Sequence, residues 1–302
     1  MVTSDNRAGP VVLIGASGRV GRMVCRHWPD PSGLLVARRH QPVATDGLLW
    51  APLEGPRALL DHLSITGVRP AALLMLAGVT PGPGVDDAAL MQGNTGLALA
   101  CLEAAEAAAI DRVLLASSSA IYGVHPAGHA FDETAQVSPV SGYGRAKLAM
   151  EALAKPFRAA GMEVCAVRIG NVAGADALLH PLAAAMTAPA APRRPIRLDA
   201  FADGLGPLRS YIGPETLARV LHALCLHPSA LPEVLNVAAS VPVRMQDLAR
   251  AAGWPCEMVT AAPSAHQCIT LDCRRLVGLC LQSPDDSDPV NMVAQWKATL
   301  SA

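Results

Sequence analysis

The sequence has few charged and few aromatic residues, and it lacks long uninterrupted apolar segments. Of its 302 residues 16% are charged and 3% aromatic, and the formal net charge is −1. A chain with so little net charge has no basic field to attract nucleic acid or anionic lipid, so we expect a small-molecule ligand. No run approaches the roughly 20 apolar residues that cross a bilayer. The first ten residues also lack the apolar core of a signal peptide. We therefore expect a cytoplasmic protein that binds neither membranes nor nucleic acid.

The eight cysteines are spread along the chain without a CxxC pair. They stand at positions 25, 101, 165, 225, 256, 268, 273 and 280. This scatter is typical of reduced, buried thiols and not of a disulfide framework. His266, Cys268 and Cys273 come nearest to a metal-binding cluster, but their spacing matches none of the usual zinc ligand pairs. We therefore expect no metal site.

Apolar residues make up 51% of the sequence, and in its first half short apolar runs alternate with longer alanine-rich or amphipathic segments. This alternation is typical of βαβ units and a parallel sheet. The expected strands cover residues 11–15, 34–37, 47–50, 71–77, 112–117 and 163–169. Helices are expected at 87–109, with an interruption near 93–96, and at 143–160. The sequence thus predicts an α/β fold with a doubly wound parallel sheet of the Rossmann type.

The composition changes after Asn171. The stretch that follows, to about residue 210, is rich in alanine, proline and glycine, and we expect it to form loops and short elements. Regular structure is expected to return with helices near 214–226 and 245–252 and a strand at 233–238. We predict a dinucleotide-binding domain over residues 1–171, to which 206–238 return. A smaller, irregular substrate-binding region would be formed by 172–205 and 239–302, over the carboxyl ends of the strands.

The stretch VVLIGASGRVGRMV places three glycines after the first expected strand and at the start of a helix. In this context Gly15 allows a tight turn, Gly18 lets the backbone approach a pyrophosphate, and Gly21 lets the helix pack against the strand. The other turn residues expected to contact a dinucleotide are Ser17, Arg19 and Val20. The alternative, which the spacing alone leaves open, is a βα turn that binds nothing.

The end of the second expected strand reads LLVARRH and carries no carboxylate. An acidic residue at this place would accept a hydrogen bond from the ribose 2′-hydroxyl of NAD. Arg38 and Arg39 instead offer guanidinium donors suited to a 2′-phosphate. NADP is therefore favoured as the cofactor, with NAD as the alternative. Two solvated arginines on a loop would give the same sequence.

The segments ASSSAIYG and SGYGRAK contain the residues that point to catalysis. Tyr143 and Lys147 are four residues apart and share one face of a helix. The ammonium group of Lys147 is expected to favour the phenolate and to lower the pKa of Tyr143, as a general acid or base requires. Ser118, at the end of the fifth expected strand, is placed to hydrogen-bond the same substrate oxygen. We therefore expect Ser118, Tyr143 and Lys147 to be catalytic; a tyrosine and a lysine without a role on a helix surface are the alternative.

Several motifs, in this order, resemble the extended short-chain dehydrogenase/reductases, the NAD(P)-dependent sugar epimerase/dehydratase group. The resembling segments cover most of the chain and are GASGRVG, LAG (76–78), GNTG, SSSAIYG, YGRAK, VRIGNVAG, RSYIGPE and LNVA. On the cofactor side, the resemblance implies that Ala77 and Gly78 approach the adenosine and the ribose. It also implies that Tyr143 is the acid/base and that Lys147 holds the nicotinamide ribose.

The resemblance also implies roles on the substrate side. Ser118 occupies the family's active hydroxyl position, and Ser119 is expected beside it at the substrate. Asn171 resembles the family's substrate-side asparagine, and Arg209 resembles the arginine that grips a nucleotide-sugar diphosphate. Two segments depart from the family pattern. RSYIGPET lacks its usual acidic and histidine positions, and LLWAPLEG lacks the aspartate expected near the adenine. A nucleotide-sugar substrate is thus a weaker expectation than the cofactor.

The expected function is hydride transfer at a secondary alcohol or ketone carbon of a sugar-like, nucleotide-linked substrate, as an epimerase, dehydratase or reductase. The first alternative is an NADP-dependent reductase of a small non-nucleotide carbonyl compound. The second is a regulator that binds a dinucleotide without catalysis. Arg193, Arg194 and Arg197 are either solvated charges or contacts to an anionic substrate. The resemblance further implies a homodimer, formed through the helices expected at 87–109 and 143–160.

Overall fold

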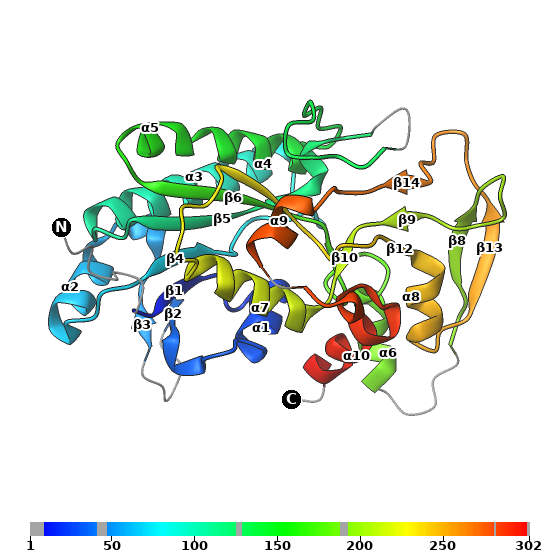
Figure 1. Ribbon diagram of the computed structural model, residues 1–302, viewed down its shortest axis with the longest axis horizontal. Helices are drawn as coiled ribbons and strands as arrows, with labels where there is room; N and C mark the ends of the chain where they lie inside the picture. Colours follow the sequence, from blue (N-terminus) through cyan, green and yellow to red (C-terminus); the bar gives the residue numbers. More distant parts are fainter. Residues whose placement is uncertain (1–8, 41–46, 125–128, 188–192, 281, 301–302) are drawn as a thin grey trace.

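The computed structural model describes residues 9–40, 47–124, 129–187, 193–280 and 282–300. Its centre is a seven-stranded sheet in the order β11-β6-β5-β4-β1-β2-β3, in which every neighbouring pair is parallel (Figure 1). The strands are β1 (Val11–Ile14), β2 (Leu34–Arg38), β3 (Leu48–Leu49), β4 (Ala72–Met75), β5 (Arg112–Ser118), β6 (Glu163–Ile169) and β11 (Val234–Val237). The prediction of a doubly wound parallel sheet is confirmed.

Helices cover both faces of this sheet. One face carries α2 (Arg57–Thr66), α3 (Asp87–Ala107), α4 (Gly142–Ala152) and α5 (Ala154–Ala159). The other carries α1 (Arg19–Arg26), α7 (Pro214–Cys225) and α10 (Pro289–Leu300) (Figure 1). The strands are apolar without alternation because both of their faces are buried.

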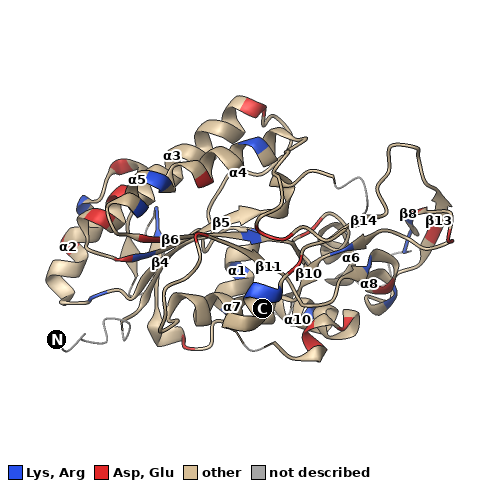
Figure 2. Ribbon diagram, turned by 45° about the horizontal axis from the view of Figure 1, so that its top comes forward, with Lys and Arg blue, Asp and Glu red and all other residues tan. Residues whose placement is uncertain are grey.

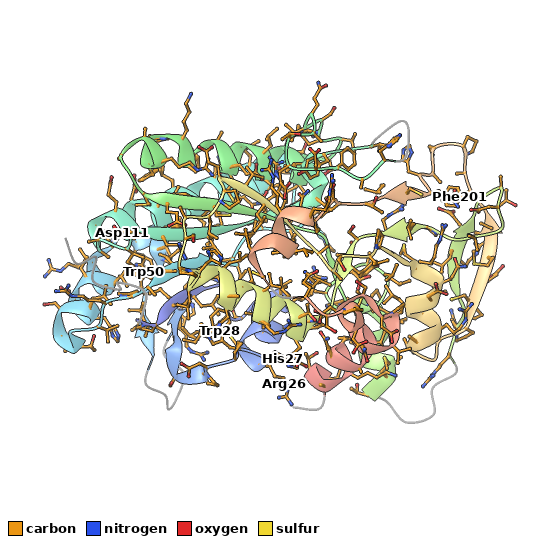
Figure 3. All side chains as sticks on the ribbon, in the orientation of Figure 1. Arg26, His27, Trp28, Trp50, Asp111 and Phe201 are labelled. Atoms are coloured by element: carbon orange, nitrogen blue, oxygen red, sulfur yellow. The ribbon has the colours of Figure 1, made fainter. Side chains whose placement is uncertain are left out.

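The alternating side chains of each strand feed two separate cores. Val11 and Leu13 of β1 pack on the side of α1 and α7, whereas Val12 and Ile14 pack on the side of α3. Trp28 belongs to the core on the side of α1 and α7, and Trp50 belongs to the core on the side of α3 (Figure 3). Each core is thus closed by its own layer of helices.

The order of the strands opens the sheet beside β1. The chain goes from β1 outward to β2 and β3, and then returns to place β4 on the other side of β1. The connections that follow β1 and β4 therefore leave the sheet in opposite directions. In open α/β sheets, ligands bind in the crevice that forms at such a point, outside the carboxyl ends of the strands.

The interruption expected near residues 93–96 is wrong, because α3 runs without a break. A Cβ atom on Gly93 would lie 2.3 Å from Cγ2 of Val79, so the glycine allows the helix to pack against the segment after β4. The side-chain amide of Asn94 donates to the carbonyl oxygens of Leu90 at 2.8 Å and Val79 at 2.9 Å. Both residues serve packing of a continuous helix.

The single helix expected at 143–160 is in fact two helices. α4 ends at Ala152 and α5 begins at Ala154, with Leu153 between them. Pro156 explains the change, because proline has no N–H to donate to the carbonyl group four residues earlier. The short α5 then leads into β6.

Smaller sheets lie beyond the carboxyl ends of the main strands, towards the right of Figure 1. They contain β7 (Asn171–Val172) with β10 (Tyr211–Ile212), β8 (Ile196–Ala200) with β13 (Cys256–Thr260), and β9 (Leu208–Arg209) between β12 (Val243–Arg244) and β14 (Cys268–Ile269). The helix α8 (Met245–Ala251) packs against β8, β12 and β13. The division into a dinucleotide-binding domain and a substrate-binding region stays a prediction.

Acidic and basic residues are interspersed over the ribbon in the view of Figure 2. The helix α2 carries side chains of both signs, whereas α3 carries only acidic and α5 only basic ones (Figure 2). Among the residues that the structure describes, none of the helices combines the length and the hydropathy needed to cross a membrane.

Candidate functional site

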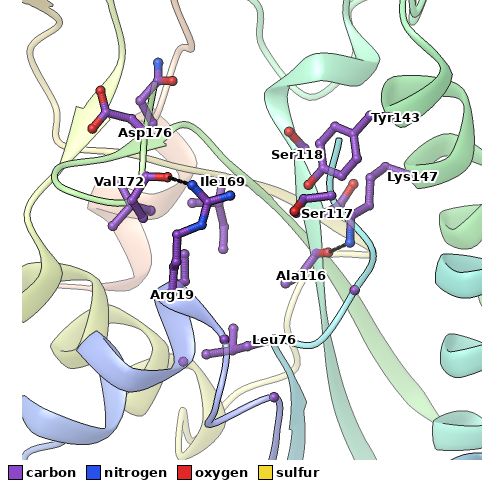
Figure 4. A pocket seen from close by; sticks show the side chains of 18 of the residues that line it. Arg19, Leu76, Ala116, Ser117, Ser118, Tyr143, Lys147, Ile169, Val172 and Asp176 are labelled. Atoms are coloured by element: carbon purple, nitrogen blue, oxygen red, sulfur yellow. Dashed lines mark hydrogen bonds between the residues drawn. The ribbon is translucent and has the colours of Figure 1, made fainter. Parts of the chain in front are cut away.

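A cavity of about 390 Å³ lies at the carboxyl ends of β1, β4, β5 and β6 (Figure 4). Most of the residues expected to bind cofactor or substrate line it: Gly15, Gly18, Arg19, Val20, Gly21, Gly78, Ser118, Tyr143, Lys147 and Asn171. Further lining residues, not expected from the sequence, include Leu76, Thr80, Ser117, Ile169, Val172 and Asp176. Residues far apart in the sequence are therefore brought to one cavity at the opening of the sheet.

The glycine turn forms the floor of the cavity. Gly15 has a φ of +101°, and a Cβ atom there would lie 2.4 Å from the backbone nitrogen of Ala77. A Cβ atom on Gly21 would lie 2.0 Å from the carbonyl oxygen of Gly15. A Cβ atom on Gly18 would lie farther away, 3.3 Å from the same carbonyl oxygen of Gly15. The fold thus requires glycine at 15 and 21, whereas a Cβ atom at position 18 would make one tight contact that a small shift relieves.

Arg19 follows this turn at the first position of α1. Its side chain is exposed and points into the cavity, where Nη1 lies 3.4 Å from the carbonyl oxygen of Ala175 (Figure 4). The guanidinium group therefore stands between the glycine turn and the segment after β7. An anion held at the turn would lie within its field.

Ser118 and Tyr143 meet at the wall formed by β5 and α4. Ser141 caps α4 by accepting a hydrogen bond from the backbone of Gly144 at 3.1 Å, which sets Tyr143 in the first turn of the helix. The side chains of Tyr143 and Ser118 both line the cavity and lie next to each other (Figure 4). They are thus placed to contact one substrate oxygen.

The expected lowering of the Tyr143 pKa is wrong. Burial raises the pKa of Tyr143 above 10, and the hydrogen bond from Ser118 offsets only part of this effect. Lys147 is not among the causes of this shift. Its Nζ lies 5.8 Å from the centre of the tyrosine ring. At neutral pH Tyr143 is therefore a phenol that can donate a proton.

Lys147 is almost fully buried and aimed at the same region. Its side chain is 4% exposed, and Nζ donates to the carbonyl oxygen of Ala116 at 2.8 Å. Burial lowers the pKa of Lys147 to about 8, against the opposing effect of the Glu151 carboxylate. A Cβ atom on Gly78 would lie 3.1 Å from Nζ and 2.6 Å from Oδ1 of Asn94. Glycine at 78 therefore leaves room beside the ammonium group.

Arg38 and Arg39 line a second, smaller cavity of about 210 Å³ at the end of β2, together with Ala16, Ser17 and His40. This cavity adjoins the glycine turn, because Ala16 and Ser17 belong to it. Ser17 thus lies with the arginines and not in the larger cavity. Among the described residues that line this second cavity there is no carboxylate.

Ser119, Ala77 and Arg209 are not among the residues that line the larger cavity. Ser119 starts a short 3-10 helix, and the backbone N–H of Ala77 donates to Ile14 at 3.1 Å. The guanidinium group of Arg209 donates to the backbone carbonyl oxygens of Leu208 at 2.8 Å, Gln267 at 2.7 Å and His266 at 2.8 Å. Its donors are engaged in holding β9 to the segment before β14.

Asp176 is a lining residue for which the sequence carries no motif. Its carboxylate accepts a hydrogen bond from the Tyr211 hydroxyl at 2.7 Å and from the backbone of Gly174, Leu178 and Leu179 at 3.0–3.3 Å. Burial raises the pKa of Asp176 despite these bonds. Asp176 thus fixes the segment that closes the cavity opposite Tyr143.

Within the described residues, no group of three or more histidine, cysteine, aspartate or glutamate side chains could hold a metal ion. His266, Cys268 and Cys273 do not form such a group.

The sequence matches the profile of the NAD dependent epimerase/dehydratase family over residues 11–238. It is 30% identical to a UDP-glucose 4-epimerase of Rhizobium leguminosarum bv. trifolii over 181 residues, which are 55% of this chain and 53% of the relative. A UDP-glucose 4-epimerase of Azospirillum brasilense is 31% identical over 186 residues, 58% of this chain and 53% of the relative. The match thus spans about half the length of these relatives.

Solved structures share the fold over nearly the whole chain. The UDP-Glc/GlcNAc 4-epimerase of Campylobacter jejuni has a TM-score of 0.75 at 15% identity, covering 97% of this chain and 99% of that one. The structure of RMD from Pseudomonas aeruginosa, complexed with NADPH, has a TM-score of 0.70 at 20% identity, covering 96% of this chain and 99% of that one. At these identities the likeness shows the fold alone.

Proposed function

The chain belongs to the NAD-dependent epimerase/dehydratase family, and we propose that it transfers hydride between a bound nicotinamide dinucleotide and a secondary alcohol or ketone carbon of a sugar-like substrate. The observation that carries this proposal is the meeting of Ser118, Tyr143 and Lys147 in one cavity with the glycine turn. These residues supply a proton donor, a neighbouring hydroxyl group and a cation beside an anion-binding backbone.

The residues around the glycine turn fit a dinucleotide. The space above Gly18 and the N–H groups at the start of α1 suit a pyrophosphate, and Arg19 adds a positive charge. The ammonium group of Lys147 would hold the nicotinamide ribose. When bound, the nicotinamide ring supplies or accepts the hydride.

NADP is the proposed cofactor, with NAD as the alternative. Arg38 and Arg39 line a cavity next to the glycine turn, and none of the described residues that line it carries a carboxylate, which suits the 2′-phosphate of NADP. Among the structural neighbours, RMD from Pseudomonas aeruginosa was solved with NADPH, and a UDP-glucose 4-epimerase from Stenotrophomonas maltophila was solved with NAD.

Proton transfer is assigned to Tyr143. Ser118 would orient the substrate oxygen, and the protonated phenol of Tyr143 would donate to that oxygen as hydride reaches the carbon. The raised pKa of Tyr143 keeps the phenol protonated at neutral pH, which suits the reductive direction. NADP as cofactor favours the same direction.

The proposed substrate is a nucleotide-linked sugar, because the relatives described above are UDP-glucose 4-epimerases. One observation favours the second candidate, a small non-nucleotide carbonyl compound. Arg209, which the resemblance assigned to the diphosphate, does not line the cavity, and three of its five N–H donors bind backbone carbonyl oxygens. A regulator that binds a dinucleotide without catalysis is less well supported, because the chain keeps both Tyr143 and Lys147.

The test combines a substrate panel with Tyr143→Phe, which removes only the hydroxyl group. Wild-type protein is expected to turn over UDP-sugars or to consume NADPH with a carbonyl compound. Tyr143→Phe should lower turnover by about 10²–10⁴-fold, the usual contribution of a general acid, because no proton is delivered. Its affinity for the dinucleotide, followed by NADPH fluorescence, should stay within about twofold, since the phenol contributes little to that binding.

Epimerisation would leave the cofactor unchanged over a cycle, whereas reduction would consume it. Tight binding of UDP would exclude the small-carbonyl candidate. Unchanged turnover by Tyr143→Phe on every active substrate would remove Tyr143 from catalysis and favour the regulator.

A further inference from the structure

A buried ion pair lies directly behind the candidate catalytic residues. Glu151 on α4 is 7% exposed and Arg168 on β6 is 5% exposed. The guanidinium group donates from Nε to Oε1 at 3.1 Å and from Nη2 to Oε2 at 2.8 Å. This is the paired geometry that an arginine and a carboxylate adopt when both bonds are well formed.

Arg168 is itself held in place from two further elements. Its Nη1 donates to the hydroxyl oxygen of Tyr122 at 2.9 Å, and its guanidinium group lies 4.9 Å from the centre of the Tyr122 ring. The Tyr122 hydroxyl in turn donates to Oδ1 of Asn236 on β11 at 2.7 Å. The arginine, and therefore the carboxylate that it binds, has little freedom to move.

Glu151 ties α4 to the end of β5. The Ser117 hydroxyl donates to Oε1 of Glu151, and one helical turn earlier Nζ of Lys147 donates to the carbonyl oxygen of Ala116. Two successive side chains on one face of α4 thus bind two successive residues of β5. The next residue of β5 is Ser118, which lies beside Tyr143 in the cavity (Figure 4).

Stability gives no clear reason for an ion pair at this place. Two buried charges lose their hydration, and replacing such a pair with apolar residues of similar size is often neutral or stabilising. An ion pair can instead serve a site by fixing the position and the charge of neighbouring groups.

We propose that Glu151, held by Arg168 and Ser117, is a positioning residue that fixes Lys147 and Tyr143 against Ser118 and keeps Lys147 in its ammonium form. This inference rests on the proposed roles of Tyr143 and Lys147. The ionisable groups around Lys147 are Tyr143 and Glu151 on its own helix and Arg168 on β6, behind Glu151. Of these, Glu151 is the one that raises the pKa of Lys147 against the effect of burial.

The test measures the charge of Lys147 directly and needs no substrate. Competitive acylation at pH 7, read by mass spectrometry, reports the neutral fraction of each lysine. Exposed Lys155 on α5 is the reference within the same chain. Removal of the carboxylate charge by Glu151→Gln is expected to lower the Lys147 pKa from about 8 by about one unit. The neutral fraction of Lys147, and its labelling rate relative to Lys155, then rises about fivefold.

Glu151→Gln leaves Arg168 buried without its partner, so Glu151→Gln with Arg168→Met is made alongside it. The double variant removes both charges at similar side-chain volume. It is also expected to increase the labelling rate of Lys147 relative to Lys155. Glu163→Gln is the matched control, because Glu163 also pairs with a buried arginine, Arg112, at 2.8 Å. That pair lies at the opposite end of β6, so its loss should lower thermal stability without changing the labelling of Lys147.

The inference is overturned if Lys147 is labelled at the wild-type rate in both Glu151 variants, or if Glu163→Gln produces the same rise. Dinucleotide affinity at pH 6 and pH 8 separates this result from failure of the proposed function. If the positioning role is correct, Glu151→Gln weakens NADPH binding about fivefold more at pH 8 than at pH 6. Equal weakening at both pH values would show a structural role alone. Wild-type protein that binds no dinucleotide would reject the proposed function, and the labelling result would still decide the charge of Lys147.

Discussion

Burial sets the protonation of the two ionisable side chains beside Ser118. It raises the pKa of Tyr143 and lowers that of Lys147 to about 8, because a site with little water disfavours both charged forms. At pH 7 the tyrosine is neutral and the lysine is mostly charged. This combination suits a proton donor next to a cation that binds phosphate or ribose oxygen.

The lysine gives the site a defined dependence on pH. The Lys147 ammonium is almost fully formed below about pH 7, half formed at about pH 8, and lost as the pH rises further, because the pKa in the folded chain lies below its usual 10.5. Dinucleotide affinity should therefore be constant below pH 7 and about tenfold weaker at pH 9. Lys147→Met should bind more weakly at pH 7 and change less than about twofold between pH 7 and pH 9. Fluorescence titration with NADPH measures both, and a flat wild-type profile would exclude the role given to Lys147.

At this scale the sequence predicts residue types better than it predicts their environment. The spacing of Tyr143 and Lys147 and the position of Ser118 are sufficient to bring these residues to one cavity. The direction of the Tyr143 pKa shift depends on burial and on a distance across α4, and neither can be deduced from spacing. The same holds for Arg209, whose hydrogen bonds go to backbone groups almost 60 residues later in the chain.

At the scale of elements, the glycine turn contains a glycine that the fold requires, Gly21, and one that a bound ligand would require, Gly18. Gly18 has a φ of −70°, which any residue can adopt, and its Cβ position meets only the Gly15 carbonyl oxygen at 3.3 Å. Gly21 has no such freedom, since its Cβ position overlaps the same oxygen at 2.0 Å. The two glycines should therefore respond differently to the same substitution.

Gly18→Ala should fold with a loss of about 1 kcal/mol, the cost of alanine at a helix N-cap, and bind NADPH at least about tenfold more weakly. The added methyl group occupies the space that a pyrophosphate would use. Gly21→Ala should lose about 3 kcal/mol or more, because α1 must move away from β1. Urea unfolding and fluorescence titration measure the two effects. Wild-type affinity in a well-folded Gly18→Ala would assign the turn to structure alone.

The larger elements follow from the sequence pattern, whereas their interruptions do not. The apolar runs identify the strands of the central sheet to within a few residues. From the sequence alone, the glycines at 93 and 96 suggest a break in α3. The structure shows that Gly93 instead makes room for the side chain of Val79, which the sequence does not place beside it. The short strands β8, β9, β12, β13 and β14 pair mostly with segments distant in sequence, so local pattern does not indicate them.

For the molecule as a whole, strand order determines where chemistry can occur. The cavity lies where the connections after the neighbouring strands β1 and β4 leave the sheet in opposite directions. The segments after β6 and β7 close it from the other side. The helices α3 and α4 pack against each other on one side of the sheet, and the first turns of α4 carry Tyr143 and Lys147 to the cavity (Figure 1). We propose that these two helices form a dimer interface, as the family resemblance implies, which would leave the cavity of each chain accessible.

Native mass spectrometry of the protein, incubated with equimolar NADP and NAD, tests the central claim most directly. The account predicts one dinucleotide bound per chain, with NADP retained in preference to NAD, on a dimer of 31.3 kDa chains. A monomer that carries the dinucleotide would reject the dimer only. Chains that carry neither dinucleotide, even at millimolar concentration, would contradict the assignment of the cavity to a nicotinamide cofactor and the hydride transfer proposed from it.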